Sequence, residues 1–220
     1  MPTATPAPAR GRLVTLEGID GAGKSTHVPA IAGFLRAQGL RVVTTREPGG
    51  TPVGEALRAV VLNERMEHDT ETLLMFAARR EHIVHTIAPA LARGDWVLCD
   101  RYTDATWAYQ GGGHGVSAAL IASLEREVVG DVSPDVTLLF DVPEAVSRER
   151  RDRARVERVE SGAVDKFERE PDAFFERVRA AYCARAAADP ARFRVIDASR
   201  PVAEIRSELQ RIVGAICGAG

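Results

Sequence analysis

The stretch Gly18-Ile19-Asp20-Gly21-Ala22-Gly23-Lys24-Ser25-Thr26 determines the predicted fold of this 220-residue chain. Its first eight residues match the phosphate-loop pattern G-x-x-x-x-G-K-[ST]. The glycines let successive backbone N–H groups turn toward one polyphosphate, and the helix that follows points its positive dipole end at the same anion. Lys24 is expected to reach the outer phosphates, and the Ser25 hydroxyl to ligate Mg²⁺. The stretch therefore predicts a polyphosphate site.

Hydrophobic patterning on either side of this loop predicts an alternation of strands and helices. The apolar residues 13–17 indicate a buried strand before the loop, and 24–38 a helix after it. Further strands are predicted at 41–46, 96–100, 136–141 and 194–196, and further helices at 53–62, 70–93, 103–110, 118–129, 143–155, 171–188 and 202–217. We expect Pro89 to bend the long helix, and residues 111–115 to form a mobile loop. The pattern predicts a three-layer α/β fold with a five-stranded parallel sheet flanked by helices.

Composition limits the class of protein. Lys and Arg total 29 and Asp and Glu total 31, so the net charge of −2 gives no reason to expect nucleic-acid or membrane partners. No apolar run approaches the roughly 18 residues of a membrane span. Three cysteines far apart in sequence favour a reducing cytoplasm. Residues 1–11, rich in Pro and Ala, read as a disordered arm, and residues 12–220 as a single domain.

Charged side chains follow the predicted strands. In parallel sheets of this kind, ligands bind at the carboxyl ends of the strands. Asp100 ends an apolar strand and is placed to hold Mg²⁺; the alternative is a helix cap or an ion pair with Arg101. Arg46 ends another strand and suits a second phosphate group; the alternative is a surface ion pair with Glu47. The sequence thus predicts two phosphate sites at one edge.

An arginine-rich segment follows the fourth strand. It contains Arg148, Arg150, Arg151, Arg153, Arg155 and Arg158. One interpretation is a solvated helix face with i,i+4 ion pairs. The other is a lid over about 148–169 that closes on ATP and supplies an arginine to the transferring phosphoryl group. Because the fourth residue of the phosphate loop is Gly21 and not arginine, a catalytic arginine has to come from elsewhere, and Arg153 is our candidate.

Other functions of phosphate loops leave no trace in the sequence. The guanine motif Asn-Lys-x-Asp is absent, because the single asparagine, Asn63, precedes Glu64. Neither a Leu-Ser-Gly-Gly-Gln motif nor a His-Arg-Asp loop is present. His82 and His85 stand three apart on a predicted helix; without a third ligand nearby, we interpret them as part of a polar helix face.

Several separated motifs together resemble the thymidylate kinase family. Beyond the phosphate loop, the motifs are Thr45-Arg46-Glu47-Pro48-Gly49-Gly50, Leu73-Leu74-Met75-Phe76-Ala77-Ala78-Arg79-Arg80, Asp100-Arg101-Tyr102, Ala108-Tyr109-Gln110-Gly111, Pro134-Asp135 and Asp165-Lys166-Phe167-Glu168. The resemblance extends from about residue 12 to the C-terminus. In the lid motif, Lys166 stands where members commonly have arginine, and lysine lacks the arginine fork.

The resemblance implies a reaction and a role for each site residue. The reaction is Mg·ATP + dTMP → ADP + dTDP, in dTTP synthesis for DNA replication, by a homodimer. ATP would lie on residues 18–26, with Mg²⁺ at Ser25 and Asp100. Lys24, Arg46, Arg101 and the lid residue Arg153 would be catalytic. The dTMP site would comprise Asp20 and Tyr109 at the sugar, Arg46 and Arg101 at the phosphate, Phe76 stacked on the thymine, and Arg80, Thr106 and Gln110 at the base edge.

Three alternatives remain open from the sequence alone. A phosphate-loop kinase for another nucleotide or nucleoside would carry a different base pocket from the predicted Phe76, Arg80 and Gln110. A nucleotide-dependent switch or partner-binding ATPase would have no use for a second phosphate site. A degenerate structural paralogue would lack some of the phosphate contacts, all of which are present in this sequence.

Overall fold

A five-stranded parallel sheet forms the centre of the protein. The computed structural model describes residues 10–159 and 166–218, with the side chains of all of these except 154–159 and 168. The strands are β1 (Leu13–Glu17), β2 (Val42–Arg46), β3 (Trp96–Asp100), β4 (Val136–Asp141) and β5 (Phe193–Asp197), in the order β2-β3-β1-β4-β5. All four strand pairs are parallel. The predicted α/β fold is confirmed, with strand ends shifted by one residue at β2 and β5.

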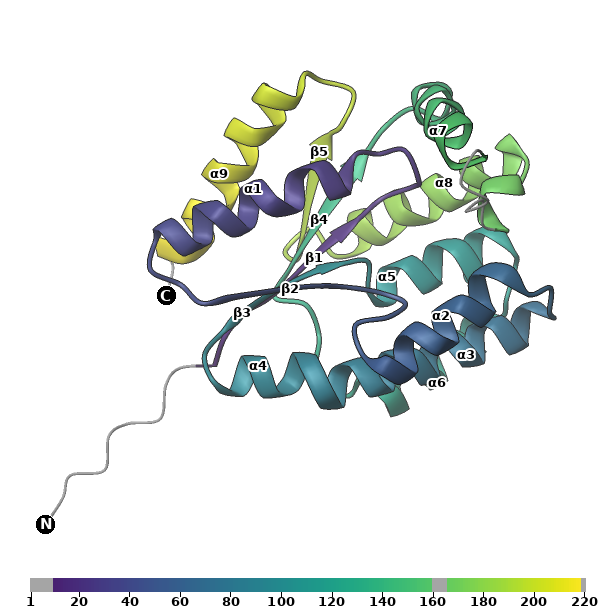
Figure 1. The fold of residues 1–220 in the computed structure, drawn as a ribbon, viewed down its shortest axis with the longest axis horizontal. Helices are drawn as coiled ribbons and strands as arrows, with labels where there is room; N and C mark the ends of the chain where they lie inside the picture. Colours follow the sequence, from purple (N-terminus) through teal and green to yellow (C-terminus); the bar gives the residue numbers. More distant parts are fainter. Residues whose placement is uncertain (1–9, 160–165, 219–220) are drawn as a thin grey trace, which may run out of the picture.

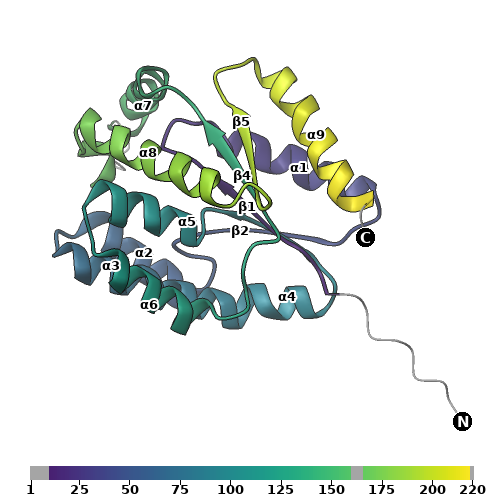
Figure 2. The same ribbon diagram turned by 180° about the vertical axis from the view of Figure 1, so that it is seen from behind.

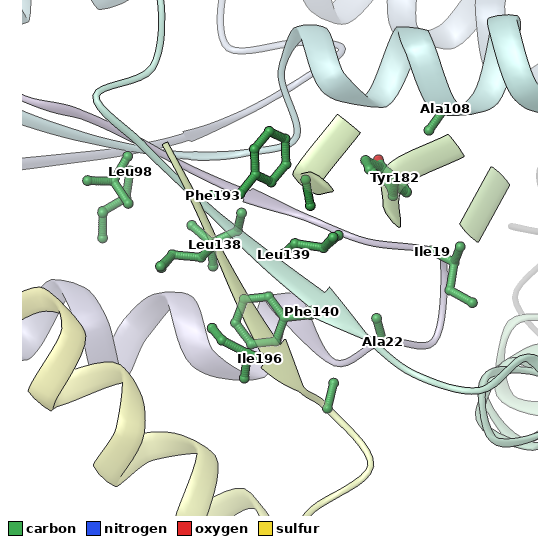
Figure 3. Close-up of a cluster of buried hydrophobic side chains, with 14 of the residues drawn as sticks. Ile19, Ala22, Leu98, Ala108, Leu138, Leu139, Phe140, Tyr182, Phe193 and Ile196 are labelled. Atoms are coloured by element: carbon green, nitrogen blue, oxygen red, sulfur yellow. The ribbon is translucent and has the colours of Figure 1, made fainter. Parts of the chain in front are cut away.

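The strands at the centre of the sheet are buried on both faces. Every residue of β1 is buried, whereas the edge strand β2 is half-exposed. This is the expected result when helices cover both faces of a parallel sheet. Figure 3 shows Phe140 of β4 beside Ile196 of β5 in the apolar core. The first strand therefore holds the phosphate loop on a rigid base.

Helices cover both sides of the sheet. They are α1 (Lys24–Ala37), α2 (Pro52–Asn63), α3 (His68–His82), α4 (Ala88–Ala92), α5 (Thr103–Thr106), α6 (Ala118–Val129), α7 (Glu144–Val159), α8 (Asp172–Ala188) and α9 (Val202–Gly218), with π-helical turns η1 (Ile83–Ile87) and η2 (Trp107–Gly113) and the 3₁₀ turn η3 (Phe167–Arg169). Figures 1 and 2 show α1 and α9 together on one side of the sheet and α3, α4 and α6 on the other. No helix in the described part of the chain is long and apolar enough to cross a membrane.

The predicted long helix over 70–93 is interrupted. It consists of α3, the π turn η1 and the short helix α4, in which Pro89 lies in the first turn. Proline lacks an N–H and its ring crowds the carbonyl four residues earlier, so a wider π turn just before it relieves both problems. At Pro89, where we expected a bend, the helix is interrupted by a π turn just before the proline.

The predicted loop at 111–115 is wrong for its first three residues, which belong to η2. Glycine's low helix propensity suggested a loop, but packing against α8 overrides that preference. A Cβ at Gly113 would lie only 2.3 Å from the Phe174 ring, and one at Gly112 2.5 Å from the Ala181 side chain. The glycines therefore let η2, which carries Tyr109 and Gln110, lie directly against α8.

Candidate active site

The phosphate loop leaves β1 at Glu17 and enters α1 at Lys24. Gly18, Gly21 and Gly23 have φ values of 137°, 78° and 86°, which side-chain-bearing residues rarely adopt. The Lys24 Nζ donates to the carbonyls of Gly18 at 2.9 Å and Ile19 at 3.1 Å, so it is held at the mouth of the loop. Burial, and then the nearby Arg101, lower the pKa of Lys24 to about 8. The charge of Lys24 is thus costly until an anion binds there.

Helix α7 packs directly on this loop (Figure 1). The Ser147 hydroxyl donates to the Asp20 carbonyl at 2.6 Å, and a Cβ at Gly21 would lie 2.6 Å from the Ser147 carbonyl oxygen. A larger residue at position 21 would therefore push α7 away from the loop. Gly21 allows the arginine-rich helix to reach the polyphosphate site.

Arg101 lies directly after β3, with an unusual positive φ of 70°. Its Nη1 donates to the Gly18 carbonyl at 2.9 Å, and its Nη2 lies 2.5 Å from Asp20 Oδ1. The Tyr109 hydroxyl joins the same pair, donating to Asp20 Oδ2 at 2.9 Å. Burial raises the pKa of Asp20, but Arg101 and Lys24 outweigh it and hold that pKa below its usual value. The structure therefore brings Asp20, Arg101 and Tyr109 together.

Two adjoining cavities open at this edge of the sheet. The larger has a volume of about 450 Å³ and is lined by Lys24, Ser25, Arg46, Asp100 and Arg101, together with residues of α7 and Arg169. The smaller, about 90 Å³, is lined by Leu62, Met75, Ala105, Tyr109, Gln110 and Phe167, among others. Asp20, Glu47, Arg58 and Arg101 line both cavities. Arg101 thus stands at the junction of a polar chamber and a more apolar one.

Arg46 and Asp100 occupy the positions that the sequence predicted, at facing ends of β2 and β3. The partners of the two arginines differ from the alternatives considered above. Arg46 Nη2 donates to Glu55 at 2.8 Å and not to Glu47, and Arg101 pairs with Asp20 and not with Asp100. Arg46 is half-exposed, so an incoming phosphate competes only with a weak surface ion pair.

Asp100 and Ser25 fit a magnesium ion. Among the described residues, Asp100 Oδ1 is one of four buried side-chain polar atoms with no hydrogen-bond partner. A buried carboxylate oxygen without a partner is costly, and a hard cation relieves that cost. Asp100 and the Ser25 hydroxyl both line the larger cavity beside the phosphate loop. Oxygen ligands of this kind are those Mg²⁺ prefers.

The structure does not bring Phe76 and Arg80 to either cavity. Phe76 is 1% exposed and belongs to the core around η1, and Arg80 Nη1 reaches the Val128 carbonyl at 3.4 Å. Of their neighbours, Met75 lines the smaller cavity, whereas the buried Arg79 lines neither cavity and donates to Glu47 at 2.7 Å. Residues 73–78 are almost all apolar, so a helical period of 3.6 residues fits adjacent positions equally well. The sequence alone therefore could not decide which of these positions faces the cavity.

Gln110 and Thr106 are both buried on the segment from α5 to η2. Gln110 lines the smaller cavity; its Nε2 donates to Glu71 at 2.7 Å, and its Oε1 has no partner. Thr106 Oγ1 instead accepts from Arg79 Nη2 at 3.1 Å and does not line either cavity. The Arg79 Nη1 is also buried without a partner. Gln110 Oε1 is therefore an unpaired acceptor on a residue that lines the smaller cavity, and Arg79 Nη1 is an unpaired donor on a residue that does not.

Arg153 does not face the cavity. Its side chain is 75% exposed and pairs with Glu149 along the surface of α7. Arg148, Arg150 and Arg151 of the same helix do line the larger cavity, and Arg150 donates to the carbonyls of Gly21 and Ala198. Successive helix residues turn by 100°, so the helix face decides which arginines reach the loop. The side chains of Arg155 and Arg158, and residue Asp165, lie outside the described residues.

The side chains of Ile19, Ala22 and Thr26, also in the predicted ATP loop, point away from the two cavities or do not line them. Ile19 and Ala22 are each 2% exposed and pack in the core, and Figure 3 shows both of them. Thr26 lies exposed in the first turn of α1. These side chains do not line the two cavities. Contact with a ligand at Gly18, Ile19 and Ala22 would therefore come from the backbone.

A buried polar network that was not predicted from the sequence lies next to Arg46, at Thr45 and Glu47. His82 is fully buried, so its interpretation as part of a polar helix face is wrong, whereas His85 is exposed as expected. His82 Nδ1 lies 2.9 Å from Glu47 Oε1, and its Nε2 lies 2.7 Å from Thr45 Oγ1. The Arg-Glu-Pro-Gly-Gly motif was a signal for Glu47, but nothing in the sequence linked it to His82. The network fixes the turn that follows Arg46.

Arg58, which lines both cavities, was also missed. It lies on α2, and its Nη1 donates to the Pro48 carbonyl at 2.9 Å. A single arginine on an amphipathic helix carries no motif, so no signal in the sequence singled it out. Its position ties α2 to the turn after β2 and adds positive charge where the two cavities meet.

The chain is similar to known proteins over most of its length. The family model described as thymidylate kinase matches residues 16–209. The chain is 60% identical over 201 residues to the thymidylate kinase of Bordetella petrii, covering 91% of this chain and 94% of that protein. It is 56% identical over 204 residues to that of Methylobacillus flagellatus, covering 93% and 97%. A crystal structure of thymidylate kinase from Ehrlichia chaffeensis matches with a TM-score of 0.71 and 32% identity, over 93% of this chain and 99% of that one. With most of its length matched by the family model and by these relatives, the chain belongs to the thymidylate kinase family.

Proposed function

We propose that this enzyme transfers the terminal phosphoryl group of Mg·ATP to dTMP, giving ADP and dTDP for dTTP synthesis. Phosphorylation of dTMP by ATP is the reaction of the family to which the chain belongs. One observation carries the proposal: Lys24 and Arg101 line the same cavity, and Arg101 also lines the adjoining base-sized cavity. A donor and an acceptor phosphate can therefore meet between the two cations.

The donor side consists of the phosphate loop and its metal ligands. The loop amides and Lys24 hold the β- and γ-phosphates, and the positive end of α1 adds to their attraction. Ser25 and Asp100 would hold Mg²⁺, which neutralises charge on the donor phosphates. The unpartnered Oδ1 of Asp100 supports this role.

The acceptor side consists of Arg46 and Arg101. The phosphate of dTMP has a second pKa near ~6 and is mostly dianionic at neutral pH, so it attacks without a strong general base. Two arginines overcome its repulsion from ATP and align it for in-line transfer. Because Arg101 is held by Asp20, Tyr109 and the Gly18 carbonyl, little rearrangement is needed when the phosphate binds.

The smaller cavity suits a pyrimidine base and its sugar. Met75 and Phe167 supply apolar surface, and Tyr109 lies edge-on to Phe167 with ring centroids 5.8 Å apart. We assign the base edge to Gln110, which lines the cavity, and to the buried Arg79, which does not line it but donates to the lining residue Glu47. Their unpaired atoms offer an acceptor and a donor. A base with the wrong edge would leave these atoms unpaired, which discriminates strongly. Asp20 and Tyr109 lie where the sugar would be.

We propose that α7 and the segment after it, about residues 148–169, act as a lid within a single domain. Arg148, Arg150 and Arg151 enter the larger cavity from α7, and Arg169 enters it from η3. Their positive charge would stabilise the equatorial oxygens during transfer and help exclude water. Arg150 is the candidate for direct contact with the transferring phosphoryl group. Its hydrogen bonds go to the carbonyls of Gly21 and Ala198, which are neutral and do not cancel its positive charge.

We further propose a homodimer in a reducing cytoplasm. Four large apolar side chains are exposed on neighbouring helices. Val53 (51% exposed) and Val60 (41%) lie two turns apart on α2, and Leu73 (50%) and Val84 (42%) lie on α3 and η1. Apolar side chains repeated along neighbouring helices suit a self-complementary interface. Cys99, Cys183 and Cys217 are all free thiols, as in a reducing compartment. Sedimentation equilibrium tests the dimer: a monomer mass at micromolar concentration would overturn it.

A coupled ADP assay against a panel of monophosphates tests the proposed substrate. We expect rapid ADP formation with dTMP, slower formation with dUMP, and almost none with dCMP, dGMP or AMP, because their base edges mismatch Gln110 and Arg79. Equal rates with dTMP and AMP would contradict the assigned base cavity. ADP formation that is independent of any monophosphate would indicate an ATPase instead.

A further inference from the structure

A second cluster of potential ligands lies beside the base cavity. His68 and Glu71 stand three residues apart in the first turn of α3, and His114 directly follows η2. Residues at i and i+3 share one face of a helix, so the His68 and Glu71 side chains point the same way. One ligand atom from each of the three lies within 4.8 Å of the others. The donor set is two imidazoles and one carboxylate.

We propose that His68, Glu71 and His114 form a binding site for a zinc-class divalent ion, separate from the magnesium site. Three protein ligands of this kind with an open fourth position are a common arrangement for Zn²⁺. Ligand atoms of a tetrahedral zinc ion lie roughly 3.3 Å apart, from metal–ligand lengths of about 2.0–2.1 Å. His114 Nε2 already lies 3.8 Å from Glu71 Oε1, so these two ligands need only a small movement. The His68 ring, which is stacked parallel to His114, has to turn for its in-plane lone pair to reach the same ion.

The two imidazoles are already brought together by packing. The rings of His68 and His114 stack with centroids 4.0 Å apart and planes 11° apart. The ring centroids of His114 and Phe174 are 4.7 Å apart, and this contact limits the movement of His114. His68 is exposed and is free to turn toward a metal ion. The site therefore combines two partly fixed ligands, Glu71 and His114, with one adjustable ligand.

Access and competition set the expected affinity. The cluster lines a cavity of about 370 Å³ that a hydrated ion can enter, and the other charged residues of its lining are Arg65, Lys166, Arg169 and Glu170. Lys166 Nζ lies 2.6 Å from Glu71 Oε2, and a metal ion has to compete with this ammonium for the carboxylate. We therefore expect micromolar binding, and tighter binding after Lys166→Met. Glu71 Oε1 also accepts from Gln110, so the metal site and the base cavity share one carboxylate.

Cobalt(II) titration of tag-free, chelator-treated protein tests the proposal without an activity assay. We expect one equivalent to bind with visible d–d bands typical of four-coordinate nitrogen and oxygen ligands. His68→Ala should weaken binding at least tenfold, and Lys166→Met should tighten it. His85→Ala is the matched control, because His85 is an exposed histidine beside a glutamate, Glu81, without a third ligand in the described structure.

Each other outcome would overturn the site. It would be wrong if the wild-type protein showed no saturable binding of one equivalent, or if His68→Ala bound cobalt as tightly as the wild type. An intense thiolate-to-cobalt charge-transfer band would place the ion on a cysteine such as the exposed Cys183. Because binding is read from the metal spectrum, failure of this proposal is distinguishable from failure of the kinase assignment.

Discussion

The Tyr182 hydroxyl donates a 2.7 Å hydrogen bond to Oε2 of the fully buried Glu17, beneath the phosphate loop. Oε1 of the same carboxylate accepts from the Tyr102 backbone N–H at 2.7 Å. The Tyr182 hydroxyl in turn accepts from Arg101 Nη1 at 3.2 Å. Each carboxylate oxygen of Glu17 is therefore linked to Arg101, which we assign to the acceptor phosphate. Oε1 is linked through the backbone of the next residue, Tyr102, and Oε2 through the Tyr182 hydroxyl.

The charge of Glu17 is expected to make stability depend on pH. Burial, and then the nearby Asp104, raise the pKa of Glu17 from 4.5 to about 7. The folded protein thus binds a proton that the unfolded chain releases above pH 4.5, so the free energy of unfolding falls as pH rises from 4.5 through 7. In Glu17→Gln this contribution, up to about 3 kcal/mol, is absent. Chemical denaturation at pH 5, 6, 7 and 8 should show the variant gaining stability relative to wild type with rising pH. A constant difference across this range would contradict the raised pKa.

Arg46→Ala should remove most of kcat/KM for dTMP and leave ATP binding nearly intact. Arg46 lines the cavity at the acceptor end, and its ion pair with Glu55 is a surface pair that contributes little to stability. Loss of a guanidinium that contacts the acceptor phosphate costs on the order of 10²-fold or more in rate. Arg41→Ala is the matched control, because Arg41 precedes the same strand at its opposite end and pairs with Asp95. Unchanged dTMP turnover in Arg46→Ala would refute its assignment.

Two arginines of α7 should differ sharply in effect. Arg150→Ala should lower kcat on the order of 10²–10³-fold, as expected for loss of a cation that stabilises developing charge. Arg153→Ala should stay within about twofold of wild type, because that side chain is 75% exposed and pairs with Glu149. Steady-state kinetics of both variants at saturating ATP and dTMP provides the comparison. The reverse order of effects would show that the helix presents its other face during turnover.

Gln110→Ala should raise the KM for dTMP about tenfold without changing the KM for ATP. The substitution removes the buried Oε1 that we assign to the base edge and leaves the Glu71 carboxylate without its amide donor. Gln38→Ala serves as the control, since Gln38 lies at the exposed C-terminal cap of α1. Equal increases in KM for dTMP and ATP would indicate general distortion and not loss of a base contact.

The sequence predicted the sheet and the residues at its carboxyl edge, because both depend on local signals. Buried strands read as continuous apolar runs, and parallel topology places their ends together, so Lys24, Arg46, Asp100 and Arg101 could be assigned to one cleft. The glycines of the loop required positive φ values, which the structure has at Gly18, Gly21 and Gly23. These features need no knowledge of tertiary packing.

The predicted site residues that do not line the cavities, such as Phe76 and Arg153, depend on the rotation of a helix. Positions 75 and 76 in α3, and 150 and 153 in α7, differ only in which face the helix buries. That face is fixed by contacts far away in the sequence, such as Ser147 against the phosphate loop, which no local pattern reveals. The buried pair of Glu47 and His82 was invisible for the same reason, since 35 residues separate them.

Product analysis is the most direct test of the central claim, that the two adjoining cavities bring ATP and dTMP together for phosphoryl transfer. Purified enzyme should be mixed with Mg·ATP and dTMP, and the nucleotides separated by anion-exchange chromatography over time. The account predicts that ADP and dTDP appear in equal amounts and that neither appears when Mg²⁺ is chelated. ADP without dTDP, or no dependence on dTMP, would contradict it.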